Sequence, residues 1–231
     1  MNSEERRLEI EKVAAECRRG LSPLLSAWIE MPETPRLGIL CVGANGHDDI
    51  LRNPEHGGVA DLIHSSTTLL STSLPSAWAI SKPRGTIEKT DYKRKFDVEV
   101  HYSRSLRDDS GNSIFSRLEY LPSIVILLTH GSQGVNPYLE DVGRTGWVTA
   151  REAASELSSL PGMNLLVVLP CCFAATVSEP FVESDRIGSV FAPLDEEIGD
   201  RNVAEMLRAL GSELRKLDLF TISRGVSHAE A

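Results

Sequence analysis

The sequence predicts a single α/β domain in which a mostly parallel sheet is covered by helices on both faces. Three short apolar runs of strand length are separated by segments with helical periodicity. Strands that alternate with helices are typical of parallel sheets, because each crossover places a helix on one face of the sheet. The chain has 231 residues, of which 41% are hydrophobic and 25% charged, so it can bury a full globular core.

The N-terminal region is expected to be a helical extension, residues 1–36, packed on a main domain at 37–231. Apolar side chains lie near one face of a helix at 4–19, and Gly20 is expected to end that helix. A second short helix is expected at 22–29, before the proline-rich breaker MPETPR.

The first half of the main domain begins with one clear strand. Residues 37–42 (LGILCV) form an apolar, partly β-branched run that is typical of a buried parallel strand. The polar stretch 43–58 is expected to be a loop at the carboxyl end of that strand. The other elements expected here are a helix at 59–70, a strand at 77–80, an edge strand or hairpin arm at 96–103 and a short helix at 114–120.

The second half contains the two strongest strands. Residues 123–129 (SIVILLT) run directly into His130-Gly131, and residues 164–169 (NLLVVL) run directly into Pro170-Cys171-Cys172. Ligand sites in such sheets lie beyond the carboxyl ends of the strands. We therefore expect the histidine and the cysteines to reach that edge of the sheet.

A helix is predicted between these two strands. Thr149 with Glu152 three residues later is a capping box, which satisfies two free amides at a helix start, and Pro161-Gly162 is expected to end the helix. The remaining expected elements are a strand at 187–192, a helix at 202–217 and a last strand at 219–222.

An imidazole and a thiol converge if the two strongest strands are neighbours, because parallel strands lie about 4.8 Å apart. The separation of His130 and Cys172, 172 − 130 = 42 residues, is sufficient for a loop, a helix and a return strand. It is also close to the roughly 50 residues between histidine and cysteine in caspases.

The segments ILLTHGSQG and NLLVVLPCCFAAT, with the helix GWVTAREAASEL before the second, resemble the caspase-like peptidases. The similarity is greatest to the CHAT and metacaspase branches and covers residues 37–222 in element order. The resemblance implies a three-layer caspase-like sandwich and a thiol protease, a hydrolase that cleaves a protein partner. Activation by a regulatory protein is left open.

Residue by residue, the resemblance implies that His130 is the catalytic histidine and Cys172 the nucleophile. It implies an oxyanion hole formed by the amides of Gly131 and Cys172, and it places Cys171 at the small residue before the nucleophile. The segment 174–186 resembles in position the mobile loop that is cut or rearranged in caspases.

Two departures from the family pattern keep an alternative open. Phe173-Ala174-Ala175 follows the nucleophile where Ser-Gly is common, and Pro170 replaces the Asp of metacaspases or the Gln of caspases. The alternative function is a catalytically inactive caspase-fold module for binding or scaffolding. His130 would then be an ordinary histidine that caps a loop.

A substrate pocket is expected to include Asp48, Asp49 and Cys171, with the acids receiving a basic side chain. The alternative is that both aspartates are solvated loop residues, and the same two interpretations apply to the acidic run 195–197. Cys171 is alternatively an inert core thiol, since free cysteine is often buried.

The remaining composition limits the partners. The net charge of −9 disfavours nucleic-acid binding, and the basic run 92–95 has acidic neighbours. The polar start of the chain carries no signal core, and no apolar run is long enough for a membrane helix. Four cysteines without disulfide or zinc spacing predict a reduced, cytoplasmic protein with no metal. No nucleotide-binding glycine motif is present and no cofactor is expected.

Overall fold

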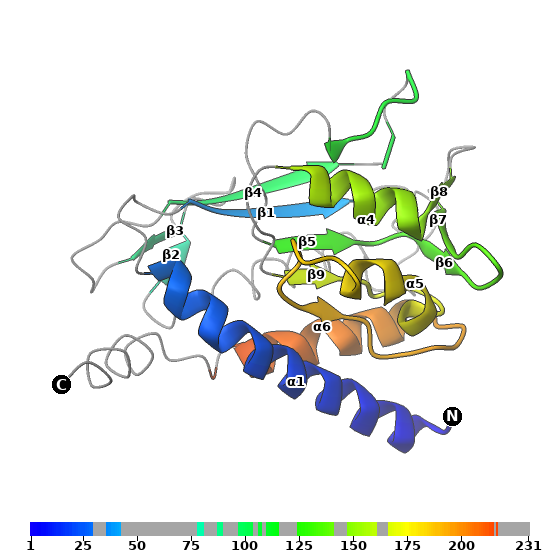
Figure 1. Ribbon diagram of the computed structural model, residues 1–231. Coiled ribbons are helices and arrows are strands. Elements are labelled where there is room, and N and C mark those ends of the chain that lie inside the picture. The colour runs from blue at the N-terminus through cyan, green and yellow to red at the C-terminus, as the bar shows by residue number, and fades with distance from the viewer. Residues whose placement is uncertain are drawn as a thin grey trace.

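The structure is a computed structural model, which describes residues 1–29, 36–42, 78–80, 87–89, 97–103, 106–107, 110–115, 124–140, 147–160, 166–214 and 216. Its helices are α1 (Ser3–Ile29), α4 (Ala150–Ser159), α5 (Ala174–Val182) and α6 (Asp200–Leu214). Its strands are β1 (Arg36–Val42), β2 (Trp78–Ile80), β3 (Ile87–Lys89), β4 (Asp97–Ser103), β5 (Ile124–Leu127), β6 (His130–Ser132), β7 (Tyr138–Glu140), β8 (Trp147–Thr149), β9 (Leu166–Val168) and β10 (Val190–Phe191). Figure 1 shows their arrangement.

A five-stranded parallel sheet organises the domain, in the order β10-β9-β5-β1-β4. The predicted mixed α/β class and parallel sheet are therefore confirmed. β1 has β4 on one side and β5 on the other, so the chain reverses its direction of progress across the sheet at β1. β4 is the edge strand that the alternating run 96–103 predicts.

One face of the sheet packs against α4 and α5. The cluster on that face joins alternate residues of β1, β5 and β9 with the apolar sides of these two helices. The alternation is required because neighbouring side chains in a strand point to opposite faces. The intervening residues Ile124, Ile126, Leu166 and Val168 are buried as well, so the second face is also covered. Figure 1 shows α1 and α6 side by side, and these helices contact each other closely.

The N-terminal helix differs from the prediction. α1 is one helix through Ile29, although Gly20 was expected to end it and residues 22–29 were expected to form a separate helix. Its buried residues are Ile10, Ala14, Cys17 and Leu21, which continue one stripe past Gly20. Burial of this stripe outweighs the weak helix propensity of glycine, which costs about 1 kcal/mol relative to alanine.

Local rules predicted α4 correctly. Thr149 is its N-cap and accepts from the Glu152 amide at 3.1 Å, while the Glu152 carboxylate accepts from the Thr149 amide at 3.0 Å. The Thr149 hydroxyl also donates to the Glu152 carboxylate at 2.8 Å, and this hydrogen bond, together with the one from the Thr149 amide, lowers the pKa of Glu152. The helix ends at Ser159, before Pro161-Gly162 as predicted.

Two small antiparallel sheets lie outside the main sheet. β2 and β3 form a hairpin, so the strand expected at 77–80 exists but pairs with β3. β6, β7 and β8 form a three-stranded sheet between β5 and α4, which the sequence interpretation did not anticipate. In β7 and β8, the central residues Leu139 and Val148 are buried, and the residues on either side of them are exposed or half-buried.

Most of the segment 174–186, which resembles in position the mobile loop of caspases, is helical. Residues 174–182 form α5, and Ala174, Val177 and Phe181 are buried in it. These side chains join the cluster with α4 and the sheet, so α5 packs against the sheet.

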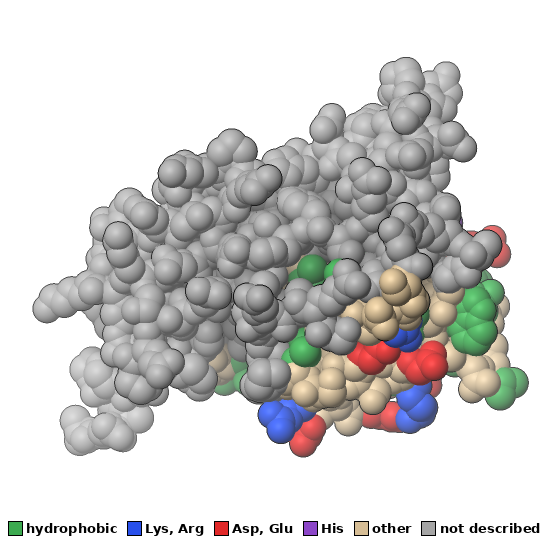
Figure 2. All heavy atoms as spheres, turned by 90° about the horizontal axis from the view of Figure 1, so that it is seen from above, with side chains coloured by type: hydrophobic (Ala, Val, Ile, Leu, Met, Phe, Trp, Pro, Cys, Tyr) green, Lys and Arg blue, Asp and Glu red, His purple; other side chains and the backbone are tan. Residues whose placement is uncertain are grey.

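Several predicted elements lie outside the described residues. They are the loop 43–58 with Asp48 and Asp49, the helix 59–70, most of the helix 114–120 and the strand 219–222. Within the described part of the chain, no helix is long and apolar enough to cross a membrane. In the face shown in Figure 2, the acidic and basic side chains of the described residues are interspersed.

Candidate active site

The two strands that carry the histidine and the cysteine are neighbours. β5 and β9 pair in parallel, and the last paired residues are Ile126 and Val168. His130 lies 130 − 126 = 4 residues beyond this pair, and Cys172 lies 172 − 168 = 4 residues beyond it. Both therefore leave the same edge of the sheet, as the sequence predicted.

Gly131 approaches Cys172 so closely that no other residue fits there. A Cβ atom on residue 131 would lie 2.0 Å from the Cys172 carbonyl oxygen and 3.0 Å from Sγ of Cys171. The first of these atoms belongs to the backbone, which cannot move aside as a flexible side chain does. The glycine of the His-Gly pair is thus required for the two strand ends to meet.

Cys172 sits at a sharp turn from strand to helix. The next residue, Phe173, has φ 51° and ψ 36°, and it is the one non-glycine residue with positive φ among those the structure describes. A bulky residue in this region is uncommon and persists only where the surroundings impose it. The turn places Cys172 directly before the start of α5.

The first amides of α5 are satisfied by the segment that follows β10. Phe173 lacks a side-chain acceptor, and its amide instead donates to the Glu196 carbonyl at 3.1 Å. The Ala175 amide donates to the Leu194 carbonyl at 3.2 Å, and the Thr176 amide donates to Oδ1 of Asp195 at 3.1 Å. Residues 194–198, hereafter the 194–198 segment, therefore cap this helix.

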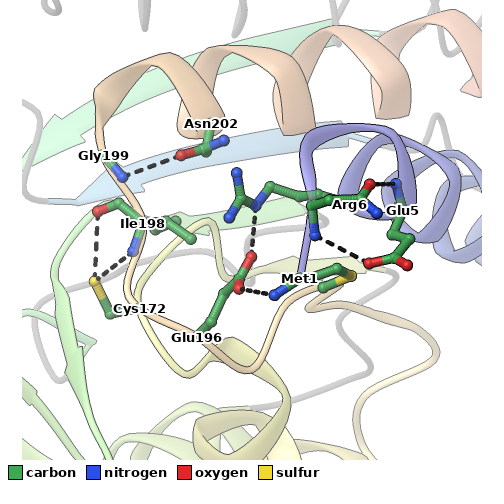
Figure 3. A network of polar contacts seen from close by, with 9 residues as sticks. Met1, Glu5, Arg6, Cys172, Glu196, Ile198, Gly199 and Asn202 are labelled. Atoms are coloured by element: carbon green, nitrogen blue, oxygen red, sulfur yellow. Dashed lines mark hydrogen bonds and ion pairs between the residues drawn. The ribbon is translucent and has the colours of Figure 1, made fainter.

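The Cys172 thiol contacts the same segment. Its Sγ accepts a hydrogen bond from the Ile198 amide at 3.3 Å and donates to the Ile198 carbonyl at 3.6 Å (Figure 3). The first contact suits a thiolate and the second suits a thiol. Cys172 is half-buried, so one side of the residue remains accessible.

Glu196 connects the 194–198 segment to α1. Its carboxylate accepts from Nε of Arg6 at 2.5 Å and pairs with the Met1 nitrogen at 3.4 Å (Figure 3). The Arg6 hydrogen bond lowers the pKa of Glu196. The side chains of Arg6 and Glu196 are 23% and 24% exposed, so water screens this pair only in part.

Cys171 has a different environment from its neighbour. It is 2% exposed and belongs to the cluster on the α4–α5 face. Burial raises the pKa of its thiol to about 12. This placement is that of the inert core thiol, and it leaves Cys171 no surface of its own to offer a substrate pocket.

His130 begins β6, and its cross-strand neighbours are exposed. In the register of the small sheet, His130 faces Glu140, and Glu140 faces Trp147. All three residues are exposed. Side chains alternate along a strand, so His130 leaves β6 on the face opposite to the one on which Gly131 meets Cys172.

Thr129 lies between the strand and the histidine. Its hydroxyl is buried, and among the described residues it has no hydrogen-bond partner. Such a group costs about 1–3 kcal/mol when it remains unpaired. Its position next to the His130-Gly131 pair makes it part of the site's immediate surroundings.

Sequence reasoning found the residues at the strand ends but missed the 194–198 segment as a support for Cys172. Asp195 and Glu196 were considered as pocket acids, whereas the structure pairs them with Thr176 and Arg6. The acidic run 195–197 was the one sequence signal that pointed to this segment. The contact between Ile198 and Cys172 uses backbone atoms of Ile198, so no side-chain pattern in the sequence indicates it. In the part of the chain that is described, no group of three His, Cys, Asp or Glu residues is arranged to hold a metal.

Comparison with models of protein families, with curated proteins and with solved structures gives no match for this chain.

Proposed function

We propose that the chain is a caspase-like cysteine endopeptidase that cleaves a protein partner, with its sheet and helices as the three-layer sandwich of that family. The observation that carries the proposal is the meeting of two strand ends. β5 and β9 are parallel neighbours, and Gly131 contacts the Cys172 backbone just beyond them. It brings the two strand ends that carry His130 and Cys172 together at one edge of the sheet.

The roles follow from the chemistry of each group. The Cys172 thiolate attacks the carbonyl carbon of the peptide bond, and the amides of Gly131 and Cys172 stabilise the oxyanion. His130 protonates the departing amine as the carbon–nitrogen bond breaks. Water then hydrolyses the thioester, which releases the acid product and returns the thiol. No metal or cofactor takes part in these steps.

The proposal also includes a cytoplasmic location and a substrate pocket at Asp48 and Asp49. A nucleophilic thiol has to remain reduced, which favours the cytoplasm, and Cys17, Cys171 and Cys172 are all free. Asp48 and Asp49 remain proposed as pocket residues for a basic side chain. Cys171 is left out of the pocket because of its burial.

The decisive experiment compares Cys172→Ala with Cys171→Ala, using cleavage of a co-expressed partner or of the chain itself. Loss of cleavage in the first variant alone supports the assignment. Equal cleavage by both variants and the wild type contradicts it. His130→Ala is expected to behave as Cys172→Ala does.

A second function is an inactive binding or scaffold module with the same fold. Two observations favour it. His130 shares an exposed row with Glu140 and Trp147, and the Cys172 sulfur makes two hydrogen bonds to the Ile198 backbone. Such a module would bind its partner without cutting it. A thiol-reactive peptide probe separates the two functions, because only the peptidase labels specifically at Cys172.

A further inference from the structure

We infer that the 194–198 segment positions the Cys172 thiol, and that α1 holds this segment in place through Arg6 and Glu196. The inference deepens the proposed function, since it takes Cys172 as the nucleophile. It assigns Ile198, Glu196 and Arg6 as positioning residues that act through Cys172. Three sets of contacts carry it, one at each step from the sulfur to the N-terminal helix.

The first step joins the segment to the turn that holds Cys172. Leu194, Asp195 and Glu196 each accept a hydrogen bond from one amide at the start of α5. One of these amides belongs to Phe173, whose left-handed conformation needs support from its surroundings. A displaced segment would therefore release the turn as well as the helix start.

The second step joins the segment to the sulfur itself. The Ile198 amide lies 3.3 Å from Sγ and donates to it. Hydrogen bonds to charged groups are stronger than those between neutral groups, so this donor stabilises a thiolate more than a thiol.

The third step joins the segment to α1. Arg6 donates to the Glu196 carboxylate, and the buried stripe of α1, which begins one turn later at Ile10, packs the helix in place. α1 also contacts α6 and β10. Because buried residues between Ile10 and Leu21 anchor α1, Arg6 can hold the 194–198 segment in position.

Asp195 and Glu196 fit a role in holding the 194–198 segment better than a role in a pocket for a basic substrate side chain. Asp195 is engaged by the Thr176 amide and Glu196 by Arg6. Both carboxylates therefore already have donors within the chain. A substrate cation would have to displace Arg6 to reach Glu196.

The test measures the rate at which iodoacetamide alkylates Cys172 at neutral pH, read by peptide mass spectrometry. Ile198→Pro removes the donating amide, whereas Ile198→Ala truncates the side chain and keeps the amide. We expect Ile198→Pro to react about tenfold more slowly than Ile198→Ala, because a charge-assisted hydrogen bond is lost. Equal rates in the two variants, or a faster rate in Ile198→Pro, would overturn the inference.

Proline can disturb the backbone beyond the loss of one amide, so two variants away from Ile198 test the inference without it. Arg6→Ala and Glu196→Gln are expected to slow alkylation about two- to fivefold, as suits a partly exposed ion pair. The matched control is Arg7→Ala, which breaks pairs with Glu4 and Glu11 on the surface of α1 and is expected to keep the wild-type rate. An unchanged or increased rate in both distant variants contradicts the role of α1.

The measurement separates positioning from simple loosening of the fold. Cys17 and Cys171 are buried, so their alkylation reports unfolding. A variant that unfolds labels Cys17 and Cys171 faster as well as Cys172, whereas loss of positioning slows Cys172 alone. Alkylation needs no peptidase activity, so the inference can fail while cleavage is observed, and it can hold in a protein that cleaves nothing.

Discussion

The backbone of Gly131 packs against that of Cys172 with no space for a side chain, since a Cβ at 131 would lie 2.0 Å from the Cys172 carbonyl oxygen. This relationship joins the end of β5 to the turn after β9. It gives Gly131 a steric reason to be glycine that is separate from any part its amide plays in catalysis. Stability and proposed activity therefore depend on the same position.

The first prediction concerns Gly131→Ala. The added methyl group has to push the Cys172 backbone away, so the free energy of unfolding is expected to fall by about 1–3 kcal/mol. Urea unfolding measures this change. The contrasting variant is Gly20→Ala, where the Cβ would have its nearest contact at 3.6 Å, with Oγ of Ser189.

Gly20 lies within α1, so Gly20→Ala is expected to raise the free energy of unfolding by about 0.5–1 kcal/mol. Equal effects of the two alanine substitutions would contradict the close approach of Gly131 to Cys172.

The second prediction concerns the left-handed residue Phe173. Phe173→Gly and Phe173→Ala both remove the ring, but only alanine keeps a Cβ at φ 51°. The glycine variant is therefore expected to be more stable than the alanine variant by about 1 kcal/mol. Thermal or urea unfolding of the Phe173→Gly and Phe173→Ala variants measures this difference in stability. The usual order at helix positions, with alanine the more stable, would show that the turn is not held in this conformation.

The sequence predicted the parts of the fold that depend on local patterns. Residues 37–42, 123–129 and 164–169 are apolar runs without competing signals, and all three contain strands of the main sheet. The capping box at Thr149 also follows from adjacent residues. Each of these signals is contained in a few neighbouring positions, so no knowledge of the tertiary structure was needed.

The parts that were missed depend on contacts between distant segments. α1 continues past Gly20 because its buried stripe packs, which propensity alone does not reveal. The strands β6, β7 and β8 have three residues each, too few for a periodic pattern to stand out. The support of Cys172 by Ile198 involves backbone atoms 26 positions away and has no side-chain signature.

The third prediction concerns the three described thiols. Burial raises the pKa of Cys17 to about 11 and that of Cys171 to about 12, so both stay protonated at neutral pH. Because the thiolate is the reactive form, native protein is expected to be alkylated at Cys172 and spared at Cys17 and Cys171. Mass spectrometry of native and urea-unfolded samples checks this. Labelling of Cys171 in native protein at the rate of Cys172 would contradict its burial.

The fourth prediction concerns Thr129, whose buried hydroxyl has no partner among the described residues. Thr129→Val replaces this hydroxyl with a methyl group of similar size. The free energy of unfolding is expected to rise by about 1 kcal/mol, because the unpaired polar group no longer has to be desolvated. Thr129→Ser keeps the hydroxyl and removes the methyl group, so it serves as the control and should not gain stability.

The last prediction concerns the pH dependence of the Arg6–Glu196 pair. The hydrogen bond from Arg6 lowers the pKa of Glu196 below its ordinary value of 4.5. A carboxylate whose pKa is lower in the folded state adds stability above its unfolded pKa. That contribution disappears as the pH falls through the lowered value. Because the pair is partly exposed, we expect at most about 1 kcal/mol.

Urea unfolding of the wild type and of Glu196→Gln between neutral pH and pH values below the lowered pKa of Glu196 tests this. The wild type is expected to be the more stable protein near neutral pH, and the difference is expected to vanish on the acid side, where the Glu196 carboxylate is protonated in both folded and unfolded chains. Glu197→Gln is the control, because the adjacent Glu197 is exposed and lies outside the network in Figure 3. A difference between wild type and Glu196→Gln that persists in acid would mean that Glu196 acts through its packing and that its charge does not hold the segment to α1.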